Sequence, residues 1–237
     1  MSQKFIFKSP LMGLSERYNP HLLLMRCRSL VLASGSSSKK IDSSEFEATD
    51  PNSAKGRLLF IAAKLFNQKG YERTTVRDLA TAAGIQSGSL FHHFKTKEDI
   101  LKSVMVDTII FNTVRMKNEM AKAENCVDAL KALIRCELES INGETGEAMS
   151  VLVYEWRSLN TENQAMILKL RNEYESLWID VITKAKQNGL VTGDVFVLRR
   201  FLTGALSWTK TWYKPKGGMT LDDLAEQALN LAIKQNV

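Results

Sequence analysis

The middle of this chain contains no proline. The 237 residues include four prolines, and none of them lies between Asn52 and Lys214. Proline interrupts helices because it lacks a backbone N–H and clashes with the preceding turn. No stretch has the strict alternation of apolar and polar residues that a β-hairpin needs. The sequence therefore predicts an all-α fold.

Cysteine is also scarce, which excludes two common kinds of small scaffold. The three cysteines, Cys27, Cys126 and Cys136, form no Cys-x-x-Cys pair and leave an odd thiol. A disulfide framework needs paired cysteines, and a zinc ribbon needs them in pairs at short spacing. Free thiols are typical of a reducing compartment, so the sequence favours the cytoplasm.

Histidine and catalytic motifs are equally rare. The chain has only His21, His92 and His93, and two neighbours on a helix diverge by about 100°, which prevents them from sharing one metal ion. The sequence holds no Gly-x-Ser-x-Gly, no P-loop and no His-Glu-x-x-His. These absences predict a protein that is not an enzyme and has neither a metal site nor a cofactor.

No apolar run reaches the roughly eighteen residues that a membrane helix needs, so no membrane partner is expected. The stretch HLLLMRCRSLVLAS is similar to a signal peptide, but Arg26 and Arg28 interrupt its apolar part. The stretch SGSSSKKIDSSEFEATDPNSAKG, rich in Ser, Asp and Lys, predicts a flexible linker. We therefore interpret residues 1–52 as a leader or flexible segment. The alternative is that translation starts at Met12 or Met25, in which case only the residues before that methionine are an artefact.

The positive charge is concentrated in one part of the chain. The whole sequence has a net charge of +6. Residues 53–102 carry nine Lys or Arg against four Asp or Glu, a net +5, whereas residues 103–237 carry sixteen against seventeen, a net −1. Clustered positive charge attracts polyanions, although a basic surface can also be merely solvated. Residues 53–102 are therefore candidates for contact with nucleic acid.

Helical periodicity runs from Ala54 almost to the C-terminus. Several helix starts are marked by a threonine followed three residues later by Asp or Gln, because the hydroxyl can cap the first turn. Such starts occur at Thr75, Thr96, Thr161 and Thr220. Nine helices are predicted, over residues 54–69, 76–83, 87–93, 97–121, 126–141, 144–157, 161–188, 194–213 and 221–235. We expect a three-helix N-terminal domain at residues 53–102 and a larger C-terminal helical bundle at residues 103–237.

The second and third predicted helices have the pattern of a helix-turn-helix. The first of the two has an apolar stripe at Val76, Leu79, Ala80 and Ala83, and the other at Ile85, Leu90 and Phe94. Gly84 between them fits the turn. Such a unit places its second helix in the major groove, where base edges carry a distinguishable code. The alternative is a short packing helix that exposes two histidines.

The polar residues of the second helix are left for DNA, because Leu90 and Phe94 face the neighbouring helices. The residues expected to face bases are Gln86, Ser87, Ser89 and His92. Those expected to contact the backbone or sugar are Phe91, His93 and Lys97. Gly88 has no side chain, which permits close approach.

The segment LFNQKGYERTTVRDLATAAGIQSGSLFHHFKTKEDIL resembles the N-terminal signature of TetR/AcrR-type transcriptional regulators. The resemblance covers Ala54 to Leu101 and includes the Gly-Tyr, Thr-Thr, Ala-Gly-Ile, Gly-Ser-Leu-Phe-His and Thr-Lys-Glu elements in order. It implies a homodimeric regulator, in most cases a repressor, whose C-terminal domain binds a small effector. A dimer with one helix-turn-helix per subunit should bind palindromic double-stranded operator DNA.

The resemblance also implies roles for individual residues. Phosphates would be held by Thr75, Arg77, His93 and Lys97, while Gln86, Ser87, Ser89 and His92 would face the groove. Gln86 departs from the family, in which Ser is common at this position, so Ser87 is an alternative helix cap. His93 replaces a phosphate-binding tyrosine.

The C-terminal region contains all four tryptophans and a candidate ligand-binding face. Arg171, Tyr174 and Trp178 are three and four residues apart and share a face of one predicted helix. Aromatic side chains with one cation suit a ligand that has an apolar body and an anionic group, although such a stripe can equally be core. The expected ligand-binding residues are Trp156, Arg171, Tyr174, Trp178 and Trp208.

Part of this region, roughly Val151 to Ile233, is similar to the C-terminal domain of a TetR subgroup that includes regulators of fatty-acid and steroid catabolism. The similarity lies in the elements YEWRSLNTENQ, LRNEYESLW and ALSWTKTWYKPKG. It implies that the effector is an acyl-CoA or a related CoA thioester. The alternative effectors are other hydrophobic molecules, such as a drug or a free fatty acid.

The helix predicted at residues 194–213 is apolar on two sides, and both must be buried. One seam contains Val195, Leu198, Leu202, Ala205 and Trp212, and the other contains Phe201, Gly204 and Trp208. Together with the last predicted helix, it would form a four-helix dimer interface, as the resemblance also implies. The expected interface residues are Leu198, Leu202, Ala205, Trp212, Leu224 and Ala228. The alternative is that both seams pack inside one subunit.

Two kinds of DNA-binding protein fit these patterns: a ligand-responsive regulator and an architectural protein without an effector. An architectural protein has no need for an aromatic-rich C-terminal region of balanced charge that is much longer than the helix-turn-helix. The sequence therefore favours the regulator.

Overall fold

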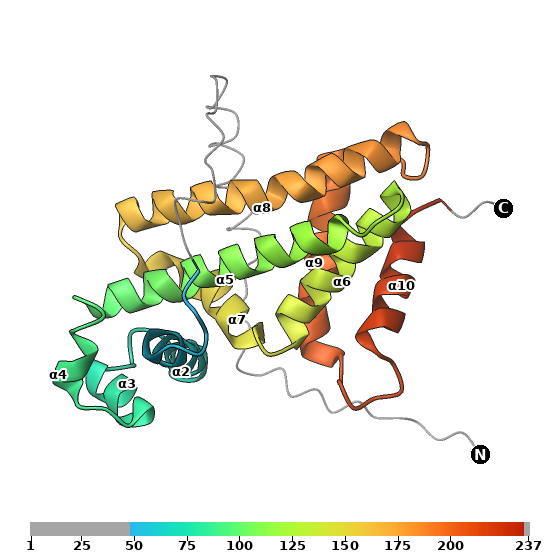
Figure 1. Ribbon diagram of the computed structural model, residues 1–237. Helices are drawn as coiled ribbons and strands as arrows, with labels where there is room; N and C mark the ends of the chain where they lie inside the picture. Colours follow the sequence, from blue (N-terminus) through green and yellow to red (C-terminus); the bar gives the residue numbers. More distant parts are fainter. Residues whose placement is uncertain (1–47, 235–237) are drawn as a thin grey trace, which may run out of the picture. The chain divides into compact units, whose positions relative to one another are not determined.

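In the computed structural model, the described part of the chain is residues 48–234, and it is helical throughout (Figure 1). These residues contain nine α-helices, one short 3-10 helix and no strand, which confirms the predicted fold class. The elements are α2 (Ala54–Lys69), α3 (Val76–Ala83), α4 (Ser87–Leu90), α5 (Lys97–Met120), α6 (Cys126–Asn142), α7 (Gly146–Tyr154), η2 (Trp156–Ser158), α8 (Thr161–Gln187), α9 (Val195–Trp212) and α10 (Leu221–Ala232). The predicted leader, residues 1–52, lies almost wholly outside the described residues. None of the described helices is long and apolar enough to cross a membrane.

Most helix N-termini are fixed by a side chain that accepts a backbone N–H. The predicted capping boxes form at Thr75 in front of α3, Thr96 in front of α5 and Thr220 in front of α10. The prediction for α8 is wrong by one residue, since Asn160 rather than Thr161 supplies the capping oxygen. Hydrogen bonds from the capping threonines lower the pKa of Asp78 in α3 and Asp223 in α10. Both carboxylates are therefore charged at neutral pH, and negative charge stabilises a helix N-terminus.

The first hydrophobic core joins α2, α3 and α4 to α7 and to the N-terminal parts of α5 and α8. Its fully buried members include Phe66 in α2, Leu79 in α3 and Leu90 in α4. Leu101 in α5 belongs to the same core. The expected domain boundary between residues 102 and 103 therefore falls inside α5, which continues across it as one helix.

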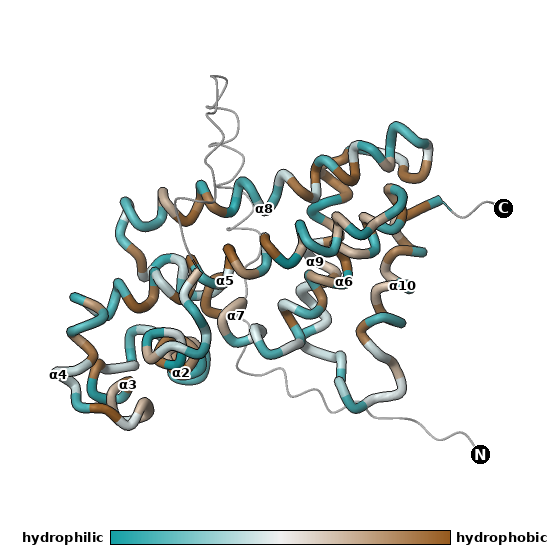
Figure 2. The backbone as a smooth tube through the Cα atoms, viewed as in Figure 1, coloured by the Kyte–Doolittle hydropathy of each residue, from teal (hydrophilic) through white to brown (hydrophobic). Residues whose placement is uncertain are grey.

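The second hydrophobic core lies among α6, α8, α9, α10 and the C-terminal part of α5. Trp178, Ile182 and Leu206 are buried in it. Tyr174, one turn before Trp178 on α8, packs against both cores. The long helices α5 and α8 contact each other and serve both cores, and Figure 2 shows apolar segments recurring along each of them.

Two predicted helices are shorter in the structure. α4 ends at Leu90, because the N–H groups of Phe91, His92 and His93 donate to carbonyls three residues back and form a tight turn. The helix predicted over residues 144–157 is divided into α7 and η2, with Glu155 at the break. The carboxylate of Glu155 accepts a hydrogen bond from the loop between α2 and α3, as described below.

Candidate functional site

α3 and α4 form the predicted helix-turn-helix, and we call residues 75–97 the reader. The chain turns between the two helices at Gly84, whose left-handed backbone (φ 66°, ψ 28°) is accessible to glycine without strain. Leu79, Leu90 and Phe94 are buried in the first core. The reader is thus held by its apolar residues, and its polar residues remain on the outside.

Eight of the nine predicted DNA-binding residues are exposed, and Lys97 is half-buried. The exposed ones are Thr75, Arg77, Gln86, Ser87, Ser89, Phe91, His92 and His93. Two further exposed cations, Arg73 just before the reader and Lys95 within it, were missed by sequence reasoning. Their signal in the sequence is the net charge of residues 53–102. Within residues 48–234, no three His, Cys, Asp or Glu side chains are grouped as a metal ion requires.

Lys97 differs from the other predicted phosphate contacts because its ammonium group already has partners. Its Nζ donates to the carbonyls of Tyr71 at 2.9 Å and Thr74 at 3.1 Å, and lies 4.1 Å from the centroid of the Tyr71 ring. Burial, followed by the charge of Glu98, raises the pKa of Tyr71 to about 12. Lys97 therefore fixes the loop that leads into α3, and an ammonium group has one further N–H for a phosphate.

Replacing Gly88 with alanine is expected to stabilise the protein and to weaken DNA binding. A Cβ added to Gly88, inside α4, meets no atom within 4 Å. Alanine is about 0.5–1 kcal/mol more favourable than glycine in a helix. The added methyl group stands where DNA must approach, so affinity should fall about tenfold, equivalent to about 1.4 kcal/mol. Urea unfolding and gel-shift titration measure the two effects; unchanged DNA affinity would contradict close approach at Gly88.

Two glutamates form hydrogen bonds between the N-terminal region and the residues around η2. Glu155 accepts the backbone N–H of Tyr71, with an Oε1–N distance of 3.0 Å. Glu98, in the first turn of α5, accepts the backbone N–H of Asn160 at 2.8 Å and the side-chain amide of Asn163 at 2.6 Å. The segment 155–160, which we call the η2 linker, is therefore bonded at one end to the loop in front of α3 and at the other end to α5.

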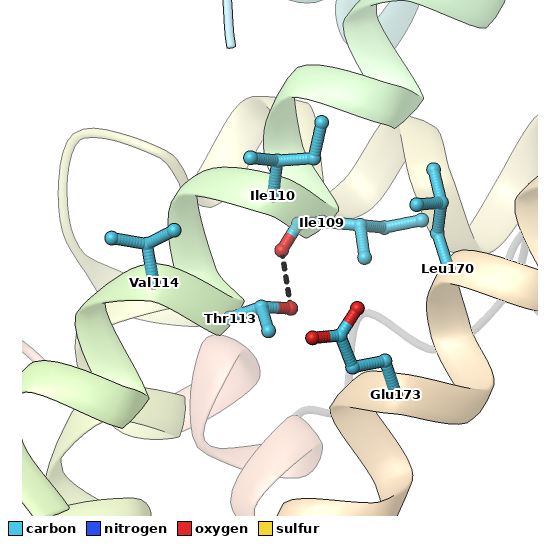
Figure 3. Close-up of a pocket in the computed structure, with 6 residues that line it drawn as sticks. All are labelled: Ile109, Ile110, Thr113, Val114, Leu170 and Glu173. Carbon is cyan, nitrogen blue, oxygen red and sulfur yellow. Dashed lines mark hydrogen bonds between the residues drawn. The ribbon is translucent and has the colours of Figure 1, made fainter. Parts of the chain in front are cut away.

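A small pocket lies between α5 and α8 (Figure 3). It is lined by Ile109, Ile110, Thr113, Val114, Leu170 and Glu173. Its volume of about 10 Å³ is close to what a single water molecule needs. Glu173 forms an ion pair with Lys117 of α5, which links the two helices beside the pocket. Drug-sized ligands occupy about 300–1,000 Å³, so a ligand of that size requires α5 and α8 to separate here.

The structure does not bring the five predicted ligand-binding residues together. Trp156 and Tyr174 pack on the first core, and Arg171 is half-buried on α8. Trp178, by contrast, is completely buried in the second core, and Trp208 is 52% exposed on α9. Trp178 and Trp208 are therefore not brought together with the other three residues, and their part in ligand binding stays a prediction. Spacing along a helix shows which residues share a face, but different neighbours cover that face at successive turns.

Sequence reasoning also missed a buried ionic cluster between α6, α8 and α9. Arg199, which is 1% exposed, pairs with Glu175 through Nη2–Oε1 at 2.9 Å and Nε–Oε2 at 3.1 Å. The same Nη2 lies 3.6 Å from Glu137, which accepts the hydroxyl of Tyr174 at 2.5 Å. The Arg199 guanidinium carbon is 4.1 Å from the centroid of the Trp178 ring. Burial, followed by the charge of Glu137, raises the pKa of Tyr174 well above its usual value, so its hydroxyl remains a neutral donor.

α9 has one face inside the protein and one outside. The inner face contains Arg199, Leu202, Leu206 and Thr209. The outer face, which we call the α9 outer face, contains Val197, Phe201, Gly204, Ala205, Trp208 and Trp212. Leu202 and Leu224 are 7% and 8% exposed because they pack in the second core, with Leu198 and Ala228 against it. Leu202 and Leu224 thus leave little surface for a partner subunit, whereas Leu198 and Ala228 are half-buried and Ala205 and Trp212 are exposed. The assignment of these six residues to a dimer interface stays a prediction.

Two sequence families cover most of the described residues. Residues 58–104 match the bacterial regulatory proteins of the tetR family, and residues 123–235 match the tetracyclin repressor-like C-terminal domain. The HTH-type transcriptional repressor KstR2 of Rhodococcus jostii is 32% identical over 192 residues, which cover 78% of this chain and 94% of that protein. KstR2 of Mycolicibacterium smegmatis is 30% identical over 190 residues, which cover 78% of this chain and 91% of that protein.

Solved structures share the fold. The crystal structure of superantigen PfiT is 57% identical, with a TM-score of 0.69, and the match covers 79% of this chain and 100% of that chain; the activity in its name belongs to that protein. The ketosteroid transcriptional regulator KstR2 of Mycobacterium tuberculosis is 27% identical, with a TM-score of 0.70, and the match covers 79% of this chain and 99% of that chain. AibR, solved with isovaleryl coenzyme A and operator DNA, shares the fold at 23% identity and a TM-score of 0.69 over 76% of this chain and 98% of that chain.

The curated relatives are transcriptional regulators rather than enzymes. Regulators of this kind bind operator DNA as dimers and respond to small ligands. The reader lies within the N-terminal family match, and α6 to α10 lie within the C-terminal one. Sequence and fold agree over more than three quarters of the chain. The chain belongs to the TetR family of transcriptional regulators.

Proposed function

We propose that the chain is a homodimeric transcriptional repressor that binds a palindromic operator in the cytoplasm and leaves it when a small effector binds. The observation that carries the proposal is the reader, which presents a continuous set of exposed polar side chains on a rigidly packed helix pair. The similarity to KstR2, a repressor by name, over 78% of the chain supports repression rather than activation.

The reader divides into residues that position it and residues that select sequence. In the proposal, phosphates are held by Thr75, Arg77, His93 and Lys97, and Phe91 lies against the sugar-phosphate backbone. Base edges are contacted by Gln86, Ser87, Ser89 and His92. Phosphate contacts give affinity that falls with salt, whereas contacts with base edges give specificity.

The α9 outer face is the proposed centre of the dimer interface. Phe201 is 73% exposed, and Trp212 is 50% exposed. A continuous apolar face of this kind marks an interaction surface in a soluble protein. Gly204 and Ala205 on the same face allow two backbones to approach closely. A two-fold axis would place the face against its own copy, with α10 of each subunit completing a four-helix interface.

The proposed effector is a CoA thioester whose acyl part enters between α5 and α8. Most of the pocket lining is apolar, as an acyl chain requires. The names of two relatives refer to apolar molecules: the ketosteroid transcriptional regulator KstR2 and the fatty acid metabolism regulator protein of Bacillus subtilis, 24% identical over 180 residues. Trp156 and Tyr174 on the first core, with Arg171 as the cation, remain the proposed partners of the ligand.

A separation of α5 and α8 by the effector would change the position of the reader. The residues that lead into α8 are bonded to Glu98, and the η2 linker is bonded to the loop in front of α3. A ligand releases DNA only by preferring the conformation in which the readers are misplaced. A 100-fold loss of DNA affinity corresponds to about 2.7 kcal/mol of such preference, within the usual range of allosteric coupling.

The effector proposal is tested by narrowing the pocket. Val114 lines the pocket and is 46% exposed, whereas Val153 on α7 is 40% exposed and does not line it. With a panel of acyl-CoAs in a gel-shift titration, wild type and Val153→Trp should release a selected operator, and Val114→Trp should retain it. Free CoA should release the operator from none of the three proteins.

Other results of this gel-shift titration would favour a different effector, a different binding site or a protein without an effector. Release by a drug or free fatty acid, but by no acyl-CoA, would replace the thioester with another hydrophobic effector. Retention of the operator by wild type against every ligand would contradict ligand control and favour an effector-independent architectural protein. If acyl-CoA releases the operator from Val114→Trp as readily as from wild type, the effector binds outside the α5–α8 pocket.

A further inference from the structure

Gln86 occupies a position at which the other helices of this chain hold a different kind of residue. In seven of the nine described α-helices, the N-cap side chain accepts a backbone N–H; α4 and α7 lack this bond. Gln86 is the N-cap of α4, with an extended backbone (φ −73°, ψ 145°). Ser, Thr, Asp and Asn are preferred at this place, and their loss costs about 1 kcal/mol. The N-terminus of α4 therefore lacks the stabilisation that a side-chain cap gives.

The side chain of Gln86 is exposed and uncommitted. Within residues 48–234 its amide makes no hydrogen bond. Ser87 and Gly88, the next residues, are small and exposed, so they leave the space around the amide open. A residue that breaks a local rule of stability without structural compensation is characteristic of a functional position.

The chemistry of the amide identifies the base that it fits. A glutamine amide carries an acceptor and a donor side by side, and adenine presents N6–H₂ as donor and N7 as acceptor in the major groove. The hydroxyls of Ser87 and Ser89 bond to any base, so they do not discriminate in this way. Residues at the N-terminus of a recognition helix are the ones that reach base edges.

We infer that Gln86 reads one adenine in each half-site of the operator by a bidentate hydrogen bond to N6 and N7. The inference rests on the proposed function, since it assumes that α4 enters the major groove. The N-cap residue of α4 would thus set the base preference at one base pair of each half-site instead of capping the helix.

The test begins with operators selected from a pool of randomised DNA duplexes by the full-length protein. Each adenine of the selected half-site is then replaced singly by 7-deazaadenine, which keeps Watson–Crick pairing but lacks the N7 acceptor. Wild type should lose affinity about tenfold at one adenine, the effect of one lost base contact. Gln86→Ala should be insensitive to the substitution at that adenine.

A change of specificity provides the second arm. Gln86→Glu should shift the preferred base at that position from adenine to cytosine, because a carboxylate accepts from cytosine N4. Gln86→Ser restores a helix cap and should bind DNA with no preference at that position. Thr81→Ala, at an exposed position of α3 outside the proposed DNA-binding residues, is the control: the sensitive adenine should remain the same as in wild type.

The outcomes separate this inference from the proposed function. If wild type selects an operator but no adenine is sensitive to loss of N7, or if Gln86→Ala keeps the sensitivity, Gln86 does not read adenine and the repressor assignment stands. If wild type selects no sequence from the pool, both the proposed function and the inference are overturned.

Discussion

Replacing Phe201 with glutamate is expected to convert the dimer into a monomer and to weaken operator binding by at least about 100-fold. Phe201 is 73% exposed on the α9 outer face. In a two-fold interface the two copies of a central residue face each other, so the variant would bury two like charges without partners. The loss in DNA affinity follows because a monomer places only one reader on the operator.

Analytical ultracentrifugation and gel-shift titration measure the two consequences of Phe201→Glu. Val153→Glu is the matched control, since Val153 is an exposed apolar residue on α7. It should leave both the dimer and the DNA affinity unchanged. A Phe201→Glu variant that sediments as a dimer would exclude the α9 outer face from the interface.

A large loss of stability is expected when the ionic cluster between α6, α8 and α9 is broken. Arg199→Met should lower the free energy of unfolding by about 3–5 kcal/mol, because it leaves the buried Glu137 without its cation. Glu137 is 4% exposed and Arg199 is 1% exposed, so water cannot replace the lost partner. Urea unfolding at neutral pH measures the loss. A loss below about 1 kcal/mol, typical of an exposed ion pair, would contradict the cluster.

The pH dependence of this loss has a defined sign. Arg199 holds the pKa of Glu175 below its usual 4.5, against the opposing effect of burial. The pair therefore contributes its full stability above pH 4.5 and loses it as the pH falls through the lowered pKa of the folded state. The difference in unfolding free energy between wild type and Arg199→Met should narrow over that interval. The double variant Arg199→Met, Glu137→Met should recover part of the loss at neutral pH, because it removes the uncompensated charge.

The reader was predictable because its determinants are local. The capping threonine, the apolar stripe and the turn at Gly84 lie within ten residues of one another, and each acts on its own helix. The end of α4 was not predictable to the residue, since the tight turn after Leu90 depends on burying Phe94 in a core made by distant helices.

The C-terminal region was less predictable because its function depends on what covers each helix face. Tyr174 and Trp178 share a face of α8, yet Tyr174 reaches both cores and Trp178 only the second. Arg199 reads as a solvated charge in the sequence, but it is three residues before Leu202 and seven before Leu206, on the same inner face of α9. That spacing indicated that Arg199 lies on the buried face of the helix. The sequence alone did not show which carboxylates of α6 and α8 would pair with it.

DNase footprinting of the wild-type protein on a selected operator shows whether the two readers of one dimer bind a two-fold symmetric DNA site. We expect equal protection of two inverted half-sites whose centres are about one helical turn, or a multiple of it, apart. Protection of a single asymmetric half-site by a monomer, or no sequence-dependent protection at all, would contradict the proposed two-fold binding.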